Sequence, residues 1–296
     1  MLDVRRLAVL AAVARHGSVT AAAQALHYSQ PSVSHHLARL EKEVGTPLLR
    51  KVGRGVRLTE AGRTLATRAE AILGRLADAE REIEEHATAR RGVVRLAAFP
   101  TAVAGLVPAG AAGLAASHPG LTVTITEAEP PEALDLLHAG EVDLAVVFDY
   151  PAQRDGRVTY SHIDLFDDHL NLVLPAGHDA TRFGQLRDEK SVTGCERCRA
   201  HLLWACARHD FVPEIVCATD DYVAVQALVA AGIGVTLLPD LALRAHTRPD
   251  LVVRRPPGID PRRVRIAVHP EEPRPEAVRA LIGQLRRAAG ELALST

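Results

Sequence analysis

Apolar residues at the start of the chain recur at the spacing of short α-helices, with polar residues and glycine between them. The pattern predicts a first helix over 4–14, and the "HGS" that follows gives a stop at Gly17 and a new N-cap. "VTAAAQAL" is a short second helix whose small side chains allow close packing. After the turn "HYS", Ser29 or Gln30 caps a third helix with Pro31 in its first turn, where a missing N–H costs nothing.

The third helix has one apolar face and one polar face. Its apolar residues follow at intervals of four, three and four and form a buried stripe: Val33, Leu37, Leu40 and Val44. The other face and the N-terminal turns carry the residues that we expect to contact DNA: Gln30, Pro31, Ser32, Ser34, His35 and Arg39. A helix N-terminus attracts phosphate, and donors of modest length suit base edges, so the segment is typical of a helix that enters the major groove. The alternative is an ordinary solvated surface.

Two neighbouring features favour DNA binding. A short helix, a turn and this third helix form the helix-turn-helix arrangement, in which the second helix reads base edges with its N-terminal residues. The following "TPLLRKVGRGVRLTEAG" sets cations around two glycines, between residues suited to two short strands. This stretch resembles a wing whose cations would lie along phosphates or in the minor groove. The predicted contacts are Arg50, Lys51, Arg54 and Arg57.

Charge is distributed unevenly along the 296 residues. The whole chain has 35 Lys and Arg against 36 Asp and Glu, a net charge of −1. Residues 1–68 hold 11 basic and 4 acidic residues, or +7, which leaves −8 for the rest. This distribution favours binding of a polyanion by residues 1–68 alone, since the acidic remainder of the chain would repel it. The alternative is chance clustering of the basic residues.

The order "AAAQALHYSQPSVSHHLARLEKEVGTPLLRKVGRGVRLTEAG" resembles the winged helix-turn-helix of LysR-type transcriptional regulators, and "FPT" and "GEVDLAV" extend the similarity. The resemblance implies an α+β multidomain fold: a winged helix-turn-helix over 1–58, a linker and dimerisation helix over 59–90, and a two-lobed α/β effector domain over 93–296. This last domain would be like periplasmic solute-binding proteins. Many members carry Arg where this chain has His35, which weakens the case for a bidentate guanine contact there.

A long helix should follow the wing, with Thr59 as its N-cap. Its apolar residues step by four and three alternately, the spacing of a coiled-coil seam: Leu65, Ala69, Ile72, Leu76, Ala79 and Ile83. We predict that this seam forms a dimer, while the alternative is packing against its own domain. The family resemblance also implies pairing, as a homodimer or a homotetramer. Paired heads would bind double-stranded DNA with paired half-sites, and RNA polymerase is a further expected contact.

Beyond a hinge ending at Gly92, short apolar runs alternate with helical segments, which favours parallel sheets with helices on both faces. By resemblance, lobe 1 covers about 93–162 and 266–296, and lobe 2 covers 163–265. Ligands in such sheets sit beyond the carboxyl ends of strands. The positions that meet this rule are Pro100, Thr101, Ala102, Phe148, Asp149, Gly194, Cys195, Thr219 and Asp220. Without the resemblance, several would simply cap helices.

The chemistry of the small-molecule effector stays open. Helix N-termini favour an anion, whereas Asp149, Asp220 and Asp221 suit a cationic or polyhydroxyl ligand better.

The four cysteines lie together between Cys195 and Cys217, which fits a reducing compartment. "CERCRAHLLWACARHD" holds enough donors to suggest zinc or a thiol switch. Cys198, His201 and Cys206 cannot converge with Cys195 around one helix, so we predict no metal and no cofactor. A redox pair of Cys195 and Cys198 is the better alternative.

Catalytic and membrane functions find little support. Among the motifs sought, neither the G-x-S-x-G nucleophile turn nor the phosphate-cradling G-x-x-x-x-G-K occurs, so we predict that the protein is not an enzyme. The chain has no run of about 18 uncharged apolar residues. "MLDVRRLAVLAAVARHGS" is interrupted by charges and lacks a cleavage pattern, so we expect a cytoplasmic regulator rather than a secreted solute-binding protein.

Overall fold

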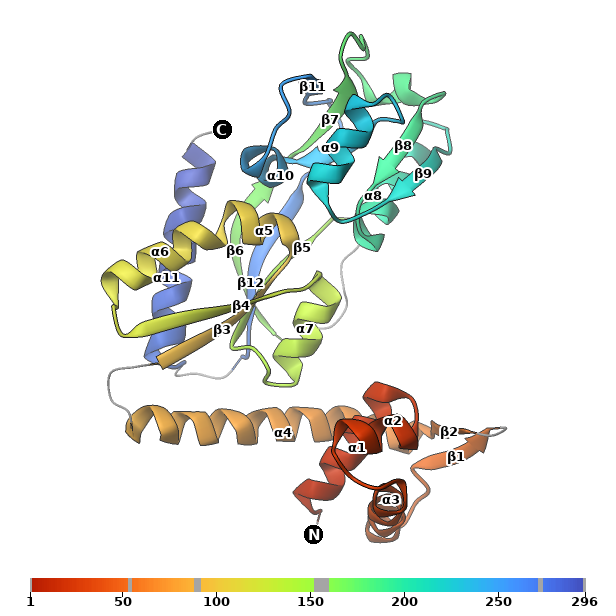
Figure 1. Ribbon diagram of the computed structural model, residues 1–296, viewed down its shortest axis with the longest axis vertical. Helices are drawn as coiled ribbons and strands as arrows, with labels where there is room; N and C mark the ends of the chain where they lie inside the picture. The colour runs from red at the N-terminus through yellow and green to blue at the C-terminus, as the bar shows by residue number, and fades with distance from the viewer. Residues whose placement is uncertain (1, 53–54, 88–91, 152–159, 271–273, 295–296) are drawn as a thin grey trace. The chain divides into compact units, whose positions relative to one another are not determined.

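The computed structural model describes residues 2–52, 55–87, 92–151, 160–270 and 274–294. The chain divides into two compact units whose sequence boundary lies near residue 90 (Figure 1), and each has its own core. In the described residues, no helix has the length and apolar character needed to cross a membrane.

The first unit begins with the three predicted helices, α1 (Val4–His16), α2 (Val19–Ala25) and α3 (Gln30–Val44). Gly17 ends α1 in the left-handed region at φ +67°, as predicted from the sequence. Ser18 caps α2 by accepting from the Ala21 N–H at 3.0 Å, and Ser29 caps α3 by accepting from the Ser32 N–H at 3.3 Å. The predicted stripe of α3 is buried against α1 and α2 at Val33, Leu37 and Leu40.

The wing is an antiparallel pair of strands, β1 (Leu49–Val52) and β2 (Gly55–Leu58). It is held to α3 by Glu41, whose Oε1 accepts from the N–H groups of Leu48 and Leu49 at 2.7 and 3.0 Å. Because one carboxylate on α3 bonds the start of the wing, the two elements keep a defined relation to each other.

The long helix α4 (Glu60–Ala87) follows directly. Thr59 Oγ1 accepts from the Gly62 N–H at 3.0 Å, which is the capping bond expected of this residue. A Cβ at Gly62 would lie 2.1 Å from the Leu48 carbonyl oxygen, so only glycine lets α4 start this close to the wing.

The predicted coiled-coil seam of α4 is divided between two environments. Ala69 is buried in the core of the first unit and Leu65 packs against that core, so these two positions serve their own domain. For Ala69, which is fully buried, the alternative of packing against its own domain therefore applies, whereas the role of Leu65 in a dimer stays a prediction. Ile72 and Leu76 are 43% and 42% exposed. Ala79 is also exposed, while the Ile83 side chain lies outside the described residues.

The second unit contains two lobes. Lobe 1 has a five-stranded sheet in the order β4-β3-β5-β12-β6. The strands are β3 (Gly92–Ala98), β4 (Leu121–Glu127), β5 (Leu144–Asp149), β6 (Ser161–Asp168) and β12 (Arg262–Val268). β3 pairs in parallel with β4 and β5, whereas β12 is antiparallel to β5 and β6. The expectation of parallel sheets therefore holds only in part, because one strand, β12, runs opposite to the other four.

Helices cover both faces of this sheet, as the apolar residues of its strands require. One face packs against α5 (Pro100–Gly105), α6 (Val107–Ser117) and α11 (Glu276–Leu294), with Leu96 and Ile266 in that core. The other face packs against α7 (Pro130–His138), with Ala97 and Ala267 in a second core. Figure 1 shows α6 with α11 on one side and α7 on the other. The alternation of Leu96 and Ala97 follows the two-residue period of a strand.

Lobe 2 has two smaller sheets. The first is antiparallel in the order β10-β7-β11, from β7 (Leu170–Pro175), β10 (Thr236–Pro239) and β11 (Leu251–Arg254). The second is the parallel pair β8 (Lys190–Thr193) and β9 (Glu214–Ala218). The helices are α8 (Glu196–Ala207), α9 (Tyr222–Ala230), α10 (Asp240–Ala245) and the 3₁₀ turn η1 (Phe183–Leu186). Gly234 lets the sheets join, since a Cβ there would lie 2.6 Å from the Lys190 carbonyl oxygen.

The chain crosses between the lobes twice, after β6 and before β12. Residues 163–168 and 262–265 therefore belong to the sheet of lobe 1. The first boundary, predicted at about 162, lies six residues later, at the end of β6. The second, predicted at about 266, lies four residues earlier, at the start of β12. The correction matters because Asp168 and Arg262 stand at the two crossings.

Candidate functional site

The polar face of α3 is open to solvent. Gln30, Pro31, Ser34, His35 and Arg39 are exposed, and Ser32 is half-buried beside the Ser29 cap. Within the described part of the chain, the Ser34 and Arg39 side chains form no hydrogen bond or ion pair, and His35 contacts only the His36 ring, edge-on at 6.3 Å. These donors and acceptors are therefore available to a ligand.

The turn before α3 adds an exposed aromatic ring that the sequence pattern did not single out. The Tyr28 ring is 43% exposed and stacks on the His36 ring, with centroids 5.9 Å apart. The ring extends the open surface at the start of α3.

The wing places like charges opposite each other. Arg50 and Arg57 are partners in the antiparallel register and both are exposed. Like charges directly across a strand pair destabilise it, so an anion between or beside them would stabilise the wing. Arg54 and the Lys51 side chain, which were also predicted to bind phosphates, lie outside the described residues.

A cavity lies between the lobes of the second unit, where parallel strand pairs from both lobes end. In lobe 1, β3 leads into Thr101 and β4 leads into Glu129. In lobe 2, β8 leads into Cys195 and β9 leads into Asp220. Because parallel strands end at one edge of a sheet, each pair brings its two following loops together.

The cavity encloses about 50 Å³. Six of the nine predicted effector residues line it: Pro100, Thr101, Gly194, Cys195, Thr219 and Asp220. Further lining residues were not predicted, among them Glu129, Cys198, Tyr222 and Arg262.

The other three predicted effector residues do not line the cavity. Ala102 is buried in the core of lobe 1. Phe148 is buried and packs edge-on against Phe99, with ring centroids 4.9 Å apart. Asp149 forms an ion pair with Arg265 at 2.8 Å on the neighbouring strand. The residues at the end of β5 therefore pack within lobe 1 and do not line the cavity.

The Arg262 guanidinium is buried beside the cavity and hydrogen-bonded to two side chains, Asp168 and Thr101. Its Nε and Nη2 donate to Asp168 Oδ2 at 2.9 and 2.8 Å, and Nη2 also donates to Thr101 Oγ1 at 2.6 Å. The guanidinium carbon lies 4.8 and 4.5 Å from the ring centroids of Phe99 and Phe148, within cation–π range. Its charge is already balanced by Asp168, so an anionic ligand gains little from it.

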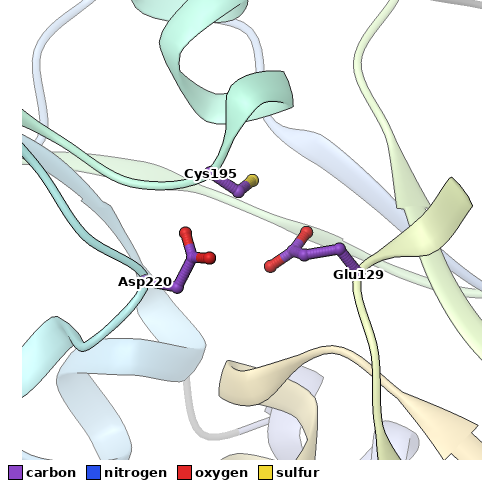
Figure 2. Close-up of side chains that lie close together, drawn as sticks. All are labelled: Glu129, Cys195 and Asp220. Atoms are coloured by element: carbon purple, nitrogen blue, oxygen red, sulfur yellow. The ribbon is translucent and has the colours of Figure 1, made fainter. Parts of the chain in front are cut away.

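Three acidic side chains from different segments converge on the cavity (Figure 2). One donor atom from each of Glu129, Cys195 and Asp220 lies within 4.8 Å of the other two. Burial, with smaller contributions from Cys195 and Asp220, raises the pKa of Glu129 to about 8. Among the described residues, Glu129 Oε2 is buried without a hydrogen-bond partner. At neutral pH Glu129 therefore keeps its proton for the most part, and one of its two oxygens lacks a partner.

Cys198 completes a thiol pair next to this cluster. Its Sγ lies 3.2 Å from Cys195 Sγ and 3.7 Å from the Tyr150 hydroxyl oxygen. The hydrogen bond from Cys195, with the charge of Arg262, lowers the pKa of the Cys198 thiol. The same bond, together with burial, raises the pKa of the Cys195 thiol.

The other donors of the cysteine-rich stretch point elsewhere. Cys206 is buried in the core of lobe 2, as its apolar neighbours in the sequence suggested. His201 is 1% exposed and stacks on Tyr150, with ring centroids 3.9 Å apart. Burial lowers the pKa of His201 to about 4.

A larger hollow of about 360 Å³ lies where β6 meets α10 and α11. Its acidic groups are already paired: Asp167 with Arg263, Asp168 with Arg262, and Asp240 with Asn171 and Arg255. It therefore offers fewer unpaired polar groups than the inter-lobe cavity.

Two domain families, both of the LysR type, match separate parts of the chain. Residues 4–63 match the family described as "Bacterial regulatory helix-turn-helix protein, lysR family", and residues 87–290 match "LysR substrate binding domain". The two matches correspond to the first and second compact units.

Individual proteins are similar over most of the chain. The transcriptional regulator CfxR of Cupriavidus necator is 30% identical over 80% of this chain and 75% of its own. A probable hydrogen peroxide-inducible genes activator of Mycobacterium avium is 35% identical over 58% of this chain and 54% of its own. The crystal structure of CbnR, a LysR family transcriptional regulator, superposes with a TM-score of 0.64 at 22% identity, covering 97% of this chain and 99% of that one.

Proposed function

Because the chain belongs to the LysR family of DNA-binding transcriptional regulators, which carry an effector-binding domain, we propose that α3 and the wing form its operator-binding surface. The observation that supports this assignment is the open face of α3. Ser34, His35 and Arg39 are exposed without side-chain partners among the described residues, apart from the ring contact of His35, and the basic strands of the wing follow on the same unit. Side chains on α3 would read base edges, while Arg50 and Arg57 would contact phosphates.

The experiment is a DNA footprint of the purified protein on the region upstream of its own coding sequence, at physiological salt. We expect two protected half-sites about one or two helical turns apart, as a dimer of helix-turn-helix heads requires. Arg39→Ala should weaken binding and relax one position, with Glu60→Ala, an exposed acidic residue on α4, as the control. Diffuse protection that disappears with modest salt would contradict the assignment.

We infer that the exposed half of the α4 seam forms the dimer contact. Ile72, Leu76 and Ala79 are exposed and lie at intervals of four and three, so they form one apolar stripe along the helix. Large apolar side chains that are more than two-fifths exposed gain free energy when a second copy covers them.

The inter-lobe cavity is the effector site that we propose. Its lining comes from both lobes, so a bound ligand would fix the angle between them and thereby alter how paired heads meet DNA. A volume of about 50 Å³ is far below the roughly 300–1,000 Å³ of pockets for drug-sized molecules. With Glu129 and Asp220 in the lining and Arg262 already paired, a small neutral or cationic ligand fits better than a carboxylate.

Oxidation of the thiol pair is a second candidate signal, favoured by the 3.2 Å between Cys195 Sγ and Cys198 Sγ. The Cys198 thiolate would attack a hydroperoxide, which breaks the O–O bond, releases one alcohol and leaves Cys198 as a sulfenic acid. The Cys195 thiol would then displace water from this sulfenic acid to form the disulfide. Peptide mass spectrometry after peroxide treatment tests this, with Cys217→Ser as the control variant. Retention of both free thiols under excess peroxide would exclude it.

A further inference from the structure

We propose that a borderline divalent cation, with Zn²⁺ as the test ion, binds in the inter-lobe cavity to Cys195 Sγ and to the carboxylates of Glu129 and Asp220. This inference rests on the proposed effector site and gives its ligand a chemical class. The sequence led us to predict no metal, because it offered only donors on one helix.

The geometry of the three donors suits one ion. Their ligand atoms lie within 4.8 Å of one another, so a point at the centre of the triangle is at most about 2.8 Å from each. Zinc bonds to sulfur and carboxylate oxygen at about 2.0–2.3 Å. The donors therefore need to approach by about half an ångström, which ordinary side-chain movement supplies. In Figure 2 the three side chains point toward one another from separate loops.

Charge and hydrogen bonding favour a cation at this point. In the described part of the chain, Glu129 Oε2 is buried and lacks a partner, which is costly for a carboxyl group. Asp220 does not cap the helix beside it, because the neighbouring Asp221 caps α9 by accepting from Val223 and Ala224. A cation bound here would give Glu129 Oε2 the partner that it lacks.

The donor types select the class of metal. A thiolate with two carboxylates suits zinc and similar borderline ions, whereas magnesium and calcium prefer oxygen donors only. Cys198 offers a further sulfur donor beside the three, since its Sγ lies 3.2 Å from Cys195 Sγ. A fourth position for Cys198 or for a water molecule would complete a tetrahedral site.

The origin of the donors connects metal binding to regulation. Glu129 follows β4 in lobe 1, whereas Cys195 and Asp220 follow β8 and β9 in lobe 2. An ion bound to all three would hold the lobes together at one angle. Its binding free energy would then shift the equilibrium between lobe arrangements, as an effector must.

The test uses the full-length protein, treated with a chelator and kept reduced. We expect one Zn²⁺ per chain by competition with a chromophoric chelator, weak or no binding of Mg²⁺, and a thiolate-to-metal absorption band with Co²⁺. Glu129→Gln, Cys195→Ser and Asp220→Asn should each weaken Zn²⁺ binding by about tenfold or more, since each removes a ligand. Cys217→Ser and Asp221→Asn are the matched controls and should leave the affinity unchanged.

A second measurement on the unmodified chain does not depend on how the variants fold. Zn²⁺ should slow alkylation of Cys195 more than alkylation of Cys217, as read by peptide mass spectrometry. Absence of the Co²⁺ band, or equal alkylation with and without Zn²⁺, would overturn the metal site. Footprints recorded with and without Zn²⁺ separate the two proposals. A protein that binds its operator but not Zn²⁺ would contradict the metal site alone. A protein that binds Zn²⁺ with no change in its footprint would contradict the role of the ion as effector.

Discussion

Replacing Arg262 with leucine should destabilise the second unit strongly. The change leaves the Asp168 carboxylate, which is 1% exposed, with one described hydrogen bond, from the Leu241 N–H at 3.1 Å. It also removes the donor to Thr101 Oγ1. Asp168 ends β6 and Arg262 begins β12, so the lost ion pair is the one that joins the two inter-lobe crossings.

Removing one partner of a buried ion pair typically costs about 3–5 kcal/mol, because the other charge stays buried without compensation. For a unit of this size, about 1 kcal/mol shifts Tm by roughly 2–4 °C, so Tm should fall by about 6–20 °C. The adjacent Arg263 provides the control: its pair with Asp167 has a 3.4 Å contact and side chains 45% and 50% exposed. Arg263→Leu should cost at most about 1 kcal/mol.

Urea unfolding followed by Trp204 fluorescence is the assay, since Trp204 is the only tryptophan in the chain and lies on α8 of the second unit. The double variant Arg262→Met/Asp168→Leu should recover a large part of the loss, because it removes both buried charges. Equal free energies of unfolding for the Arg262→Leu and Arg263→Leu variants would refute the reasoning.

Three further predictions concern acid stability, assembly and DNA binding. Burial lowers the pKa of His201 to about 4 from an ordinary 6.5. Below pH 6.5 the unfolded chain therefore binds a proton that the folded chain does not, and the free energy of unfolding should fall by up to about 3 kcal/mol between pH 6.5 and pH 4. His201→Phe should flatten this loss in urea titrations at pH 7 and pH 4, and an unchanged loss would contradict it. Ile72→Glu should shift sedimentation toward monomer, whereas Ala77→Glu, another exposed position on α4, should not. Arg57→Ala should weaken binding to all DNA sequences alike and reduce the salt slope by about 0.9, measured by anisotropy; a sequence-dependent loss would argue against a phosphate contact.

Features with local causes were predictable from the sequence. Gly17, Ser18 and Ser29 end or cap helices through bonds to residues no more than four positions away, so their types announce their roles. The sequence pattern did not single out β6, β8, β9 or β11 as strands. The last three have only four or five residues each, and such short strands depend on pairing with distant segments.

The cavity residues that were missed had signals of different strength. Glu129 follows the carboxyl end of β4, so the rule that identified Thr101 applies to it equally. Its meeting with Cys195 and Asp220 depends on contact between two lobes, which no local pattern encodes. Arg262 lies two and four residues before Val264 and Ile266, so it is on the same face of β12, and all three are buried. Arg263 is on the other face and is exposed. The two-residue period of the strand could therefore have marked Arg262 as the buried arginine.

Thr101 connects the cavity to the crossings between the lobes. Its side chain lines the cavity and accepts a bond from Arg262, which also holds Asp168 at the end of β6. Asp168 in turn accepts from the N–H of Leu241 on α10 in lobe 2. A ligand that moves Thr101 must therefore lengthen or redirect a hydrogen bond of the buried Arg262 guanidinium, at a cost of the order of 1–3 kcal/mol. This cost is comparable to typical coupling free energies between sites, so at the proposed effector site it would link occupancy of the cavity to the angle at the crossings.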